Sequence, residues 1–156
     1  GKSTLINKFV GKALAKTGDK AGVTRGKQWV RVKRDFELLD TPGILWPKFE
    51  DQRVGERLAF TGAINDDILD SETLACKLID YLRKLYPNAL AERYKVTYDE
   101  NTKSEEVLSE IAVNRGFKLK GNELDLKRAA DILIDEFRAA KLGRMTLESV
   151  ENVLED

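Results

Sequence analysis

Gly1-Lys2-Ser3-Thr4, the first four residues of the chain, have the sequence with which a phosphate-binding P-loop ends. In the full motif, G-x-x-x-x-G-K-[ST], backbone N–H groups cradle the phosphates, the lysine reaches their outer oxygens and the hydroxyl binds Mg²⁺. The first glycine of the motif and its strand do not precede the quartet in this sequence. Four residues alone do not establish a nucleotide site, so the interpretation depends on the segments that follow.

Two later segments come in the order that a nucleotide switch requires. Thr24 ends the tetrapeptide Ala-Gly-Val-Thr at 21–24, and Asp40 and Gly43 frame a D-x-x-G turn after the strand-like residues 36–39. Thr24 would offer its hydroxyl to Mg²⁺ and Gly43 its N–H to the γ-phosphate, and both contacts would be lost with that phosphate. Each residue alone is explained as well by a capped turn, but their joint occurrence after the quartet favours a switch.

The predicted site depends on charge and position rather than on covalent chemistry. Lys2 would neutralise the β and γ phosphates, Ser3 would bind Mg²⁺ directly, and Asp40 would reach the ion most simply through a water. The metal set is therefore Ser3, Thr24 and Asp40. The full nucleotide-binding set is Gly1, Lys2, Ser3, Thr4, Thr24, Asp40 and Gly43.

The catalytic group is not assigned within the chain. Ile44 stands where Ras-type switches carry the glutamine that orients the attacking water, and an isoleucine side chain cannot form a hydrogen bond. The guanine-reading motif [NT]-K-x-D is also missing from residues 44–156, where the nearest string is Thr102-Lys103-Ser104-Glu105. That string ends in glutamate and follows no apolar strand, so we interpret it as accidental. Either the base is not guanine or its reading motif precedes residue 1.

The composition of the chain, 156 residues with 27 basic and 27 acidic side chains, allows one ordinary domain or two small ones. Residues 1–60 carry a net charge of +6 and residues 61–156 a net charge of −6, so the front suits polyanions. We expect neither a signal peptide nor a membrane span, and a single cysteine, Cys76, in the apolar core of a cytoplasmic monomer. The chain contains no histidine to act as general base or metal ligand.

Hydrophobic periodicity predicts a mixed α/β chain. Leu5, Ile6, Phe9 and Val10 form one stripe of a helix that ends at Gly11, and residues 28–32 and 36–39 form a hairpin. We expect residues 96–106 to be a linker. The remaining predicted helices are a short one through Val54, Leu58 and Ala59, and others over 71–86, 90–94, 106–115 and 125–141.

Six segments of the chain together resemble the ribosome-biogenesis GTPase A family. They are GKSTLIN at 1–7, KTGD at 16–19, GVT at 22–24, LDTPGILWPKFED at 39–51, GNELD at 121–125 and FRAAKLGR at 137–144. The chain departs from the family at Ala21, where proline is usual. The family is circularly permuted, with its base-reading motifs ahead of the P-loop, which would explain why [NT]-K-x-D is missing here.

The resemblance implies a GTP-binding and GTP-hydrolysing switch that assists assembly of the large ribosomal subunit. It implies part of a permuted P-loop GTPase domain at 1–95 and a small all-α, RNA-binding domain at 103–156. The implied cofactors are GTP or GDP, Mg²⁺ and K⁺, and the implied partners are the large-subunit precursor, rRNA and ribosomal proteins. The family's hydrolysis is attributed to a histidine that would precede residue 1.

Two other classes of function remain open on the residues alone. One is a P-loop ATPase or kinase of unrelated role, which a comparison of GTP with ATP binding would reveal. The other is a non-enzymatic RNA-binding module with a vestigial P-loop, which would bind no nucleotide in a Mg²⁺-dependent way. Seven basic side chains would carry an RNA contact in either the module or the GTPase: Lys118, Lys120, Lys127, Arg128, Arg138, Lys141 and Arg144.

We predict that the 156 residues alone bind GTP weakly and do not prefer it to ATP. Lys2, Ser3, Asp40 and one helix dipole attract an anion, but they offer too few contacts to offset the entropic costs of holding a nucleotide. Calorimetry with both nucleotides, on this chain and on a chain extended at its N-terminus, is the measurement. Tight, guanine-selective and Mg²⁺-dependent binding by the shorter chain would place a base site after Gly43 and contradict the permuted order.

Overall fold

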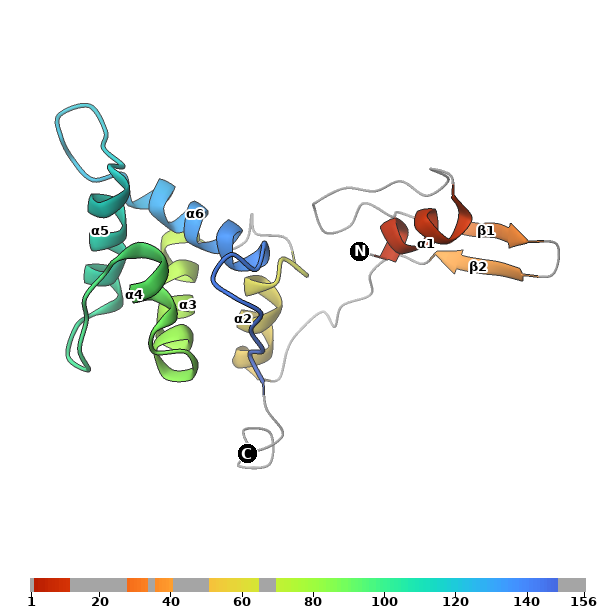
Figure 1. Ribbon diagram of the computed structural model, residues 1–156, viewed down its shortest axis with the longest axis horizontal. Coiled ribbons are helices and arrows are strands. Elements are labelled where there is room, and N and C mark those ends of the chain that lie inside the picture. Colours follow the sequence, from red (N-terminus) through yellow and green to blue (C-terminus); the bar gives the residue numbers. More distant parts are fainter. Residues whose placement is uncertain (1, 12–27, 34–35, 41–50, 65–69, 149–156) are drawn as a thin grey trace.

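The computed structural model describes residues 2–11, 28–33, 36–40, 51–64 and 70–148. In chain order these residues form α1 (Lys2–Val10), β1 (Gln28–Lys33), β2 (Phe36–Asp40) and then α2 (Gln52–Phe60), α3 (Ser71–Leu85), α4 (Ala89–Tyr94), α5 (Ser104–Arg115) and α6 (Leu126–Arg138) (Figure 1). The mixed α/β content expected from the sequence is confirmed. None of the described helices is long and apolar enough to cross a membrane.

The N-terminal elements form a small α/β unit in which α1 packs on an antiparallel hairpin. Trp29 pairs with Leu39 and Arg31 with Glu37, and the register shifts between Arg31 and Lys33. The hairpin is therefore confirmed, with Asp40 as the last residue of β2.

The apolar stripe of α1 divides into two pairs. Ile6 is buried against Val30, with Val10 packed beside them. Leu5 and Phe9, in contrast, are 57% and 65% exposed. Residues four positions apart lie above one another on a helix, so each pair occupies a face of its own. The hairpin covers the Ile6 face and leaves the Leu5 face open to solvent.

Helices α2 to α6 share one hydrophobic core, in which α3 contacts each of the other four. Asp70 caps α3 by accepting a 3.0 Å hydrogen bond from the backbone N–H of Thr73. The fully buried side chains include Phe60, Leu78, Ile79, Leu82, Leu90, Leu108, Ile111 and Leu133. The apolar face of α5, which comprises Val107, Leu108, Ile111 and Ala112, is buried.

The structure shifts several predicted helix ends, including those of α4, which begins at Ala89 rather than at Leu90, and α6, which begins at Leu126 rather than at Asp125. α3 ends at Leu85 rather than at Tyr86, and α5 begins at Ser104 rather than at Glu106. α6 ends at Arg138, three residues earlier than predicted, because Ala140 adopts a φ of +55° that no α-helix continues through. The backbone between Ala140 and Gly143 then turns so that Leu142 packs against the core.

The predicted linker at 96–106 includes the first residues of α5, and its other residues, 96–103, are held in place between α4 and α5. Val96 is part of the core, and Arg83 of α3 donates to the carbonyl oxygens of Asp99 and Thr102. The Asn114 amide donates to the carbonyls of Tyr94 and Lys95 from the other side. One core joins the helices on both sides of this segment, and the predicted division into domains at 1–95 and 103–156 stays a prediction.

A buried carboxylate joins α4, α5 and α6. Glu136 is 7% exposed, and Arg93 holds both its oxygens through Nε at 2.9 Å and Nη2 at 2.6 Å. The Tyr94 hydroxyl donates to Oε2 at 2.9 Å, and Arg115 Nη2 lies 3.2 Å from the same oxygen. These hydrogen bonds, with that of Arg93 the largest, lower the pKa of Glu136 from 4.5 to about 2.

We predict that Glu136→Gln lowers the free energy of unfolding at pH 7 by roughly 3 kcal/mol, because a pKa lowered from 4.5 to about 2 represents that much stabilisation of the ionised form. The stabilisation is complete above pH 4.5 and is lost as the pH falls from 4.5 to about 2, so the variant should also flatten the pH dependence in that window. Urea unfolding at several pH values measures both effects.

The matched control for this prediction is Asp135→Asn, at the neighbouring exposed position of α6. It should change the free energy of unfolding by less than about 0.5 kcal/mol. A Glu136→Gln variant as stable as the parent, with an unchanged acid limb, would show that the buried cluster does not stabilise the bundle.

Candidate functional site

The Gly-Lys-Ser-Thr quartet lies at the start of α1. The helix begins at Lys2, so the backbone N–H groups of its first turn belong to the quartet, and Thr4 is exposed. The first turn of α1 carries no acidic residue, so no side chain there offsets the positive end of the helix dipole. This arrangement matches the helix side of a phosphate site.

Asp40 is the last residue of β2 and pairs with Gln28. β2 contacts α1, and Figure 1 shows the arrowhead of β2 lying beside that helix. Packing of Ile6 on Val30 fixes α1 on the hairpin. The strand end that carries Asp40 therefore belongs to the same small unit as the quartet.

The rest of the predicted nucleotide site lies outside the described residues. Gly1, Thr24, Gly43 and Ile44 are in this group, so their predicted roles stay predictions. The metal set of Ser3, Thr24 and Asp40 also stays a prediction, because Thr24 lies outside the described residues. Within the described part of the chain, no group of three or more Asp, Glu or Cys side chains is arranged to hold a metal ion.

The predicted RNA-contacting side chains divide between the two ends of α6. Lys118, Lys120, Lys127 and Arg128 lie on the connection from α5 and on the first turn of α6, whereas Arg138, Lys141 and Arg144 lie at or beyond its last residue. We call the exposed set Lys118, Lys120 and Lys127 the basic surface. The sequence could not separate the two groups, since it shows only that all seven are basic.

The connection that carries the basic surface is an ordered turn. Lys118 pairs with Leu124 in an isolated antiparallel bridge, and the N–H of Leu119 donates to the Glu123 carbonyl at 2.8 Å. Lys118 Nζ donates a hydrogen bond to the side-chain oxygen of Asn122 at 2.7 Å. These contacts fix the backbone of the turn, which presents two lysines, Lys118 and Lys120.

Arg138 differs from the other predicted RNA contacts because it acts inside the protein. Its Nε donates to the Phe60 carbonyl at 3.1 Å and its Nη2 donates to the Ala59 carbonyl at 2.7 Å. Both carbonyls belong to the last turn of α2. The expectation that Arg138 contacts RNA is thus corrected: its guanidinium caps a helix.

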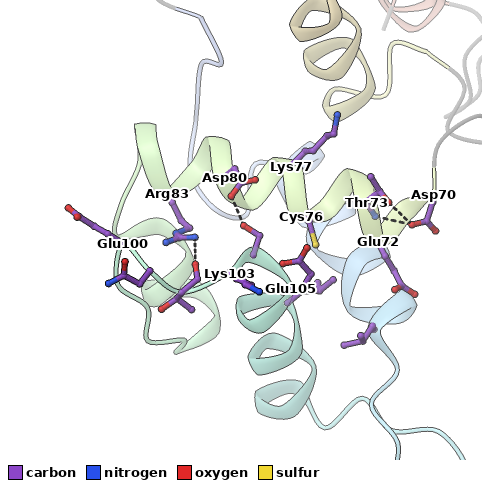
Figure 2. A pocket seen from close by; sticks show the side chains of 15 residues that line it. Asp70, Glu72, Thr73, Cys76, Lys77, Asp80, Arg83, Glu100, Lys103 and Glu105 are labelled. Carbon is purple, nitrogen blue, oxygen red and sulfur yellow. Dashed lines mark hydrogen bonds between the residues drawn. The ribbon is translucent and has the colours of Figure 1, made fainter.

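A cleft of about 660 Å³ lies along α3 and α5 and was not predicted from the sequence. Figure 2 shows Asp70, Glu72, Cys76 and Asp80 along α3, facing Glu105 at the start of α5. Its charged lining comprises five carboxylates (Asp70, Glu72, Asp80, Glu100 and Glu105) and three cations (Lys77, Arg83 and Lys103). The carboxylates exceed the cations, so the cleft does not suit a phosphate backbone.

The cleft also contains two features noted in the sequence, the string at 102–105 and Cys76. The Ser104 hydroxyl donates a hydrogen bond to Asp80. The last two residues of the string Thr102-Lys103-Ser104-Glu105 begin α5, which agrees with the interpretation of this string as accidental. Cys76 packs at the edge of the core, and burial, followed by the charge of Glu105, raises the pKa of its thiol to about 11. The thiol is therefore protonated and unreactive at neutral pH.

The chain matches known proteins over most of its length. A family model described as "50S ribosome-binding GTPase" matches residues 1–114. A Bacillus cereus protein named "Ribosome biogenesis GTPase A" is 48% identical over 151 residues, which are 97% of this chain and 51% of that protein. The chain spans about half the length of the curated relatives it matches.

Two solved structures have a similar fold. GDP-bound YlqF is 25% identical with a TM-score of 0.63, and the match covers 97% of this chain and 56% of that one. GNP-bound YlqF from T. maritima is 24% identical with a TM-score of 0.64, at the same coverage.

Proposed function

The chain belongs to the 50S ribosome-binding GTPase family, and from this premise we propose that the full-length protein is a GTP-hydrolysing switch that assists assembly of the large ribosomal subunit. The observation that carries the proposal is the quartet at the start of α1 together with Asp40 at the end of β2, in one packed unit. The similarity to proteins named ribosome biogenesis GTPase A supports the assembly role.

The proposed nucleotide is GTP, which hydrolysis converts to GDP and phosphate, with Mg²⁺ as its metal and K⁺ as a further cofactor. Lys2 would neutralise the outer phosphates. Ser3 and Thr24 would bind Mg²⁺ through their hydroxyls, and Asp40 would contact the ion through a water. Backbone N–H groups of Gly1, Thr4 and Gly43 would complete the phosphate contacts. Such a site lowers the barrier by positioning and charge, so each charged member should matter more to hydrolysis than to folding.

We also propose the circularly permuted order for the whole protein. The P-loop end, Thr24 and the D-x-x-G turn come first in this chain, and residues 44–156 contain no [NT]-K-x-D motif. The curated relatives are about twice as long as the matched part, which leaves room for a base-reading segment. The proposed partners are the large-subunit precursor, its rRNA and ribosomal proteins, which a monomer would meet in the cytoplasm.

We expect Asp40→Asn to lower GTP hydrolysis by the full-length protein at least tenfold, about 1.4 kcal/mol of barrier, because it removes a charge beside Mg²⁺ while keeping the side-chain shape. Lys2→Ala should weaken GTP binding more than GDP binding. Steady-state phosphate release and calorimetry measure the two effects.

Glu37→Gln is the control for both site variants, since Glu37 is an exposed residue of β2 that pairs with Arg31. It should leave hydrolysis and binding unchanged. If Asp40→Asn or Lys2→Ala behaves like this control, the assignment of the site is wrong.

The RNA contact is proposed for the basic surface. Lys118, Lys120 and Lys127 are exposed, and the ordered turn holds the first two in place. The acidic cleft borders the basic surface at Lys127, because the adjacent residue Leu126 lines the cleft. We expect the RNA contact to end at this border. Hydrogen bonds from Thr73 lower the pKa of Asp70, and the nearby charge of Lys127 adds to this effect.

We predict that replacing Lys118, Lys120 and Lys127 by alanine weakens binding of the full-length protein to large-subunit precursor particles. The slope of log affinity against log salt should fall by about one unit for each lost phosphate contact. The matched control replaces the exposed lysines Lys84, Lys95 and Lys103, which removes the same charge from other elements. Equal slopes for the two triple variants would remove the basic surface from consideration.

A further inference from the structure

Helix α2 stands between the candidate nucleotide site and the helical bundle in the chain. It begins at Gln52, shortly after the D-x-x-G turn that ends at Gly43. Asp51 caps its start by accepting a 2.8 Å hydrogen bond from the Arg53 N–H. A displacement of the chain around the turn would therefore reach α2 before any other described helix.

The far end of α2 is clamped by a side chain from α6. The guanidinium of Arg138 donates to the carbonyls of Ala59 and Phe60, which are both buried residues of the last turn. A planar guanidinium fork fits two adjacent carbonyls, and a cation at the C-terminal end of a helix is favoured by the helix dipole. Arg138 thus fixes the last turn of α2 to the last residue of α6.

Further contacts seat α2 in the bundle. Glu56 pairs with Lys77 of α3, and the Phe60 ring packs edge-on against Tyr81 with centroids 5.3 Å apart. Arg57 Nη1 lies 2.6 Å from a carboxylate oxygen of Glu148, beyond α6. The two exposed ion pairs are individually weak, so the Arg138 clamp and the Phe60 packing fix the position of α2.

Helix α6 connects this clamp to the basic surface. It runs for 13 residues from Leu126 to Arg138, a length of about 20 Å. Lys127 lies on its first turn, and the turn that carries Lys118 and Lys120 leads directly into it. Leu133 and Ala129, fully buried on the core side, keep the helix packed along its length. A tilt of α6 at Arg138 would therefore also displace Lys127.

We propose that Arg138 is a positioning residue through which α2 and α6 couple the nucleotide state to the affinity of the basic surface for RNA. This inference rests on the proposed function and specifies its route. Loss of the γ-phosphate would shift α2, Arg138 would transmit the shift to α6, and the basic surface would change its fit to the phosphate backbone. Because coupling is reciprocal, RNA binding would change GTP affinity relative to GDP affinity by the same factor.

The test measures the affinity of the full-length protein for large-subunit precursor particles in the presence of a non-hydrolysable GTP analogue and of GDP. The coupling factor is the ratio of the two affinities, and we expect at least about fivefold for the parent protein. In Arg138→Gln the factor should fall to about one, while affinity for each nucleotide in the absence of particles stays within about twofold. Arg138→Lys should restore part of the factor, since lysine keeps a donor and the charge but loses the fork.

Arg128→Gln is the matched control, because Arg128 is also a basic residue of α6 but stacks on Phe117, with its guanidinium carbon 4.6 Å from the ring centroid. It should change affinity equally in both nucleotide states and leave the coupling factor intact. Thermal unfolding identifies any variant that has lost its fold, and Arg138→Lys then carries the test.

Three results would overturn the inference. Equal affinity of the parent protein with both nucleotides would show that no coupling exists, although the proposed function in RNA binding would stand. An unchanged factor in folded Arg138→Gln or an undiminished one in folded Arg138→Lys would show that the route does not pass through Arg138. Absence of particle binding by the parent in either state would refute the proposed function itself, and the inference with it.

Discussion

The helical bundle depends on one buried negative charge, the carboxylate of Glu136. An ionised group in a protein interior costs several kcal/mol unless it is paired and fully hydrogen-bonded. Glu136 meets that condition with the fork of Arg93, the hydroxyl of Tyr94 and the guanidinium of Arg115. Well-packed apolar side chains in place of the whole charged cluster could match its stability, so the particular contribution of Glu136 is geometric. It fixes the rotation of α4, a helix of six residues that is too short to be stable alone.

Sequence patterns predicted those elements whose stability comes from local periodicity. Leu74, Leu78 and Leu82 recur on one face of α3 at the spacing of a helix. Glu136 and Arg138 could not be interpreted in this way, because Arg93, Tyr94 and the α2 carbonyls that they contact lie more than forty residues away, and a charged residue on a helix usually faces solvent. The polar segment before α5 was predicted to be a linker because the side chains that hold it, Arg83 of α3 and Asn114 of α5, lie outside the segment itself.

The candidate nucleotide site shows the opposite balance. The order of the quartet, Thr24 and the D-x-x-G turn carries the prediction, whereas the structure adds the start of α1 and the place of Asp40 at a strand end. The split of the apolar residues on α1 was not predictable from periodicity, since Leu5 and Ile6 differ only in which face meets the hairpin. The order of the motifs therefore predicts the nucleotide site, whereas the packing of α1 on the hairpin determines which apolar residues are buried beneath it.

Gly62 connects the backbone of α2 to the clamp that holds it. The chain leaves α2 with a φ of +70° at this residue, a conformation that side chains other than glycine seldom adopt. A Cβ atom at this position would stand 3.2 Å from Nε of Arg138, so the missing side chain also gives the guanidinium room to reach the Ala59 and Phe60 carbonyls. The turn and the clamp thus require each other. Asp51 caps the first turn of α2 and Arg138 caps the last, and the Phe60–Tyr81 contact and the Glu56–Lys77 pair join the same helix to α3.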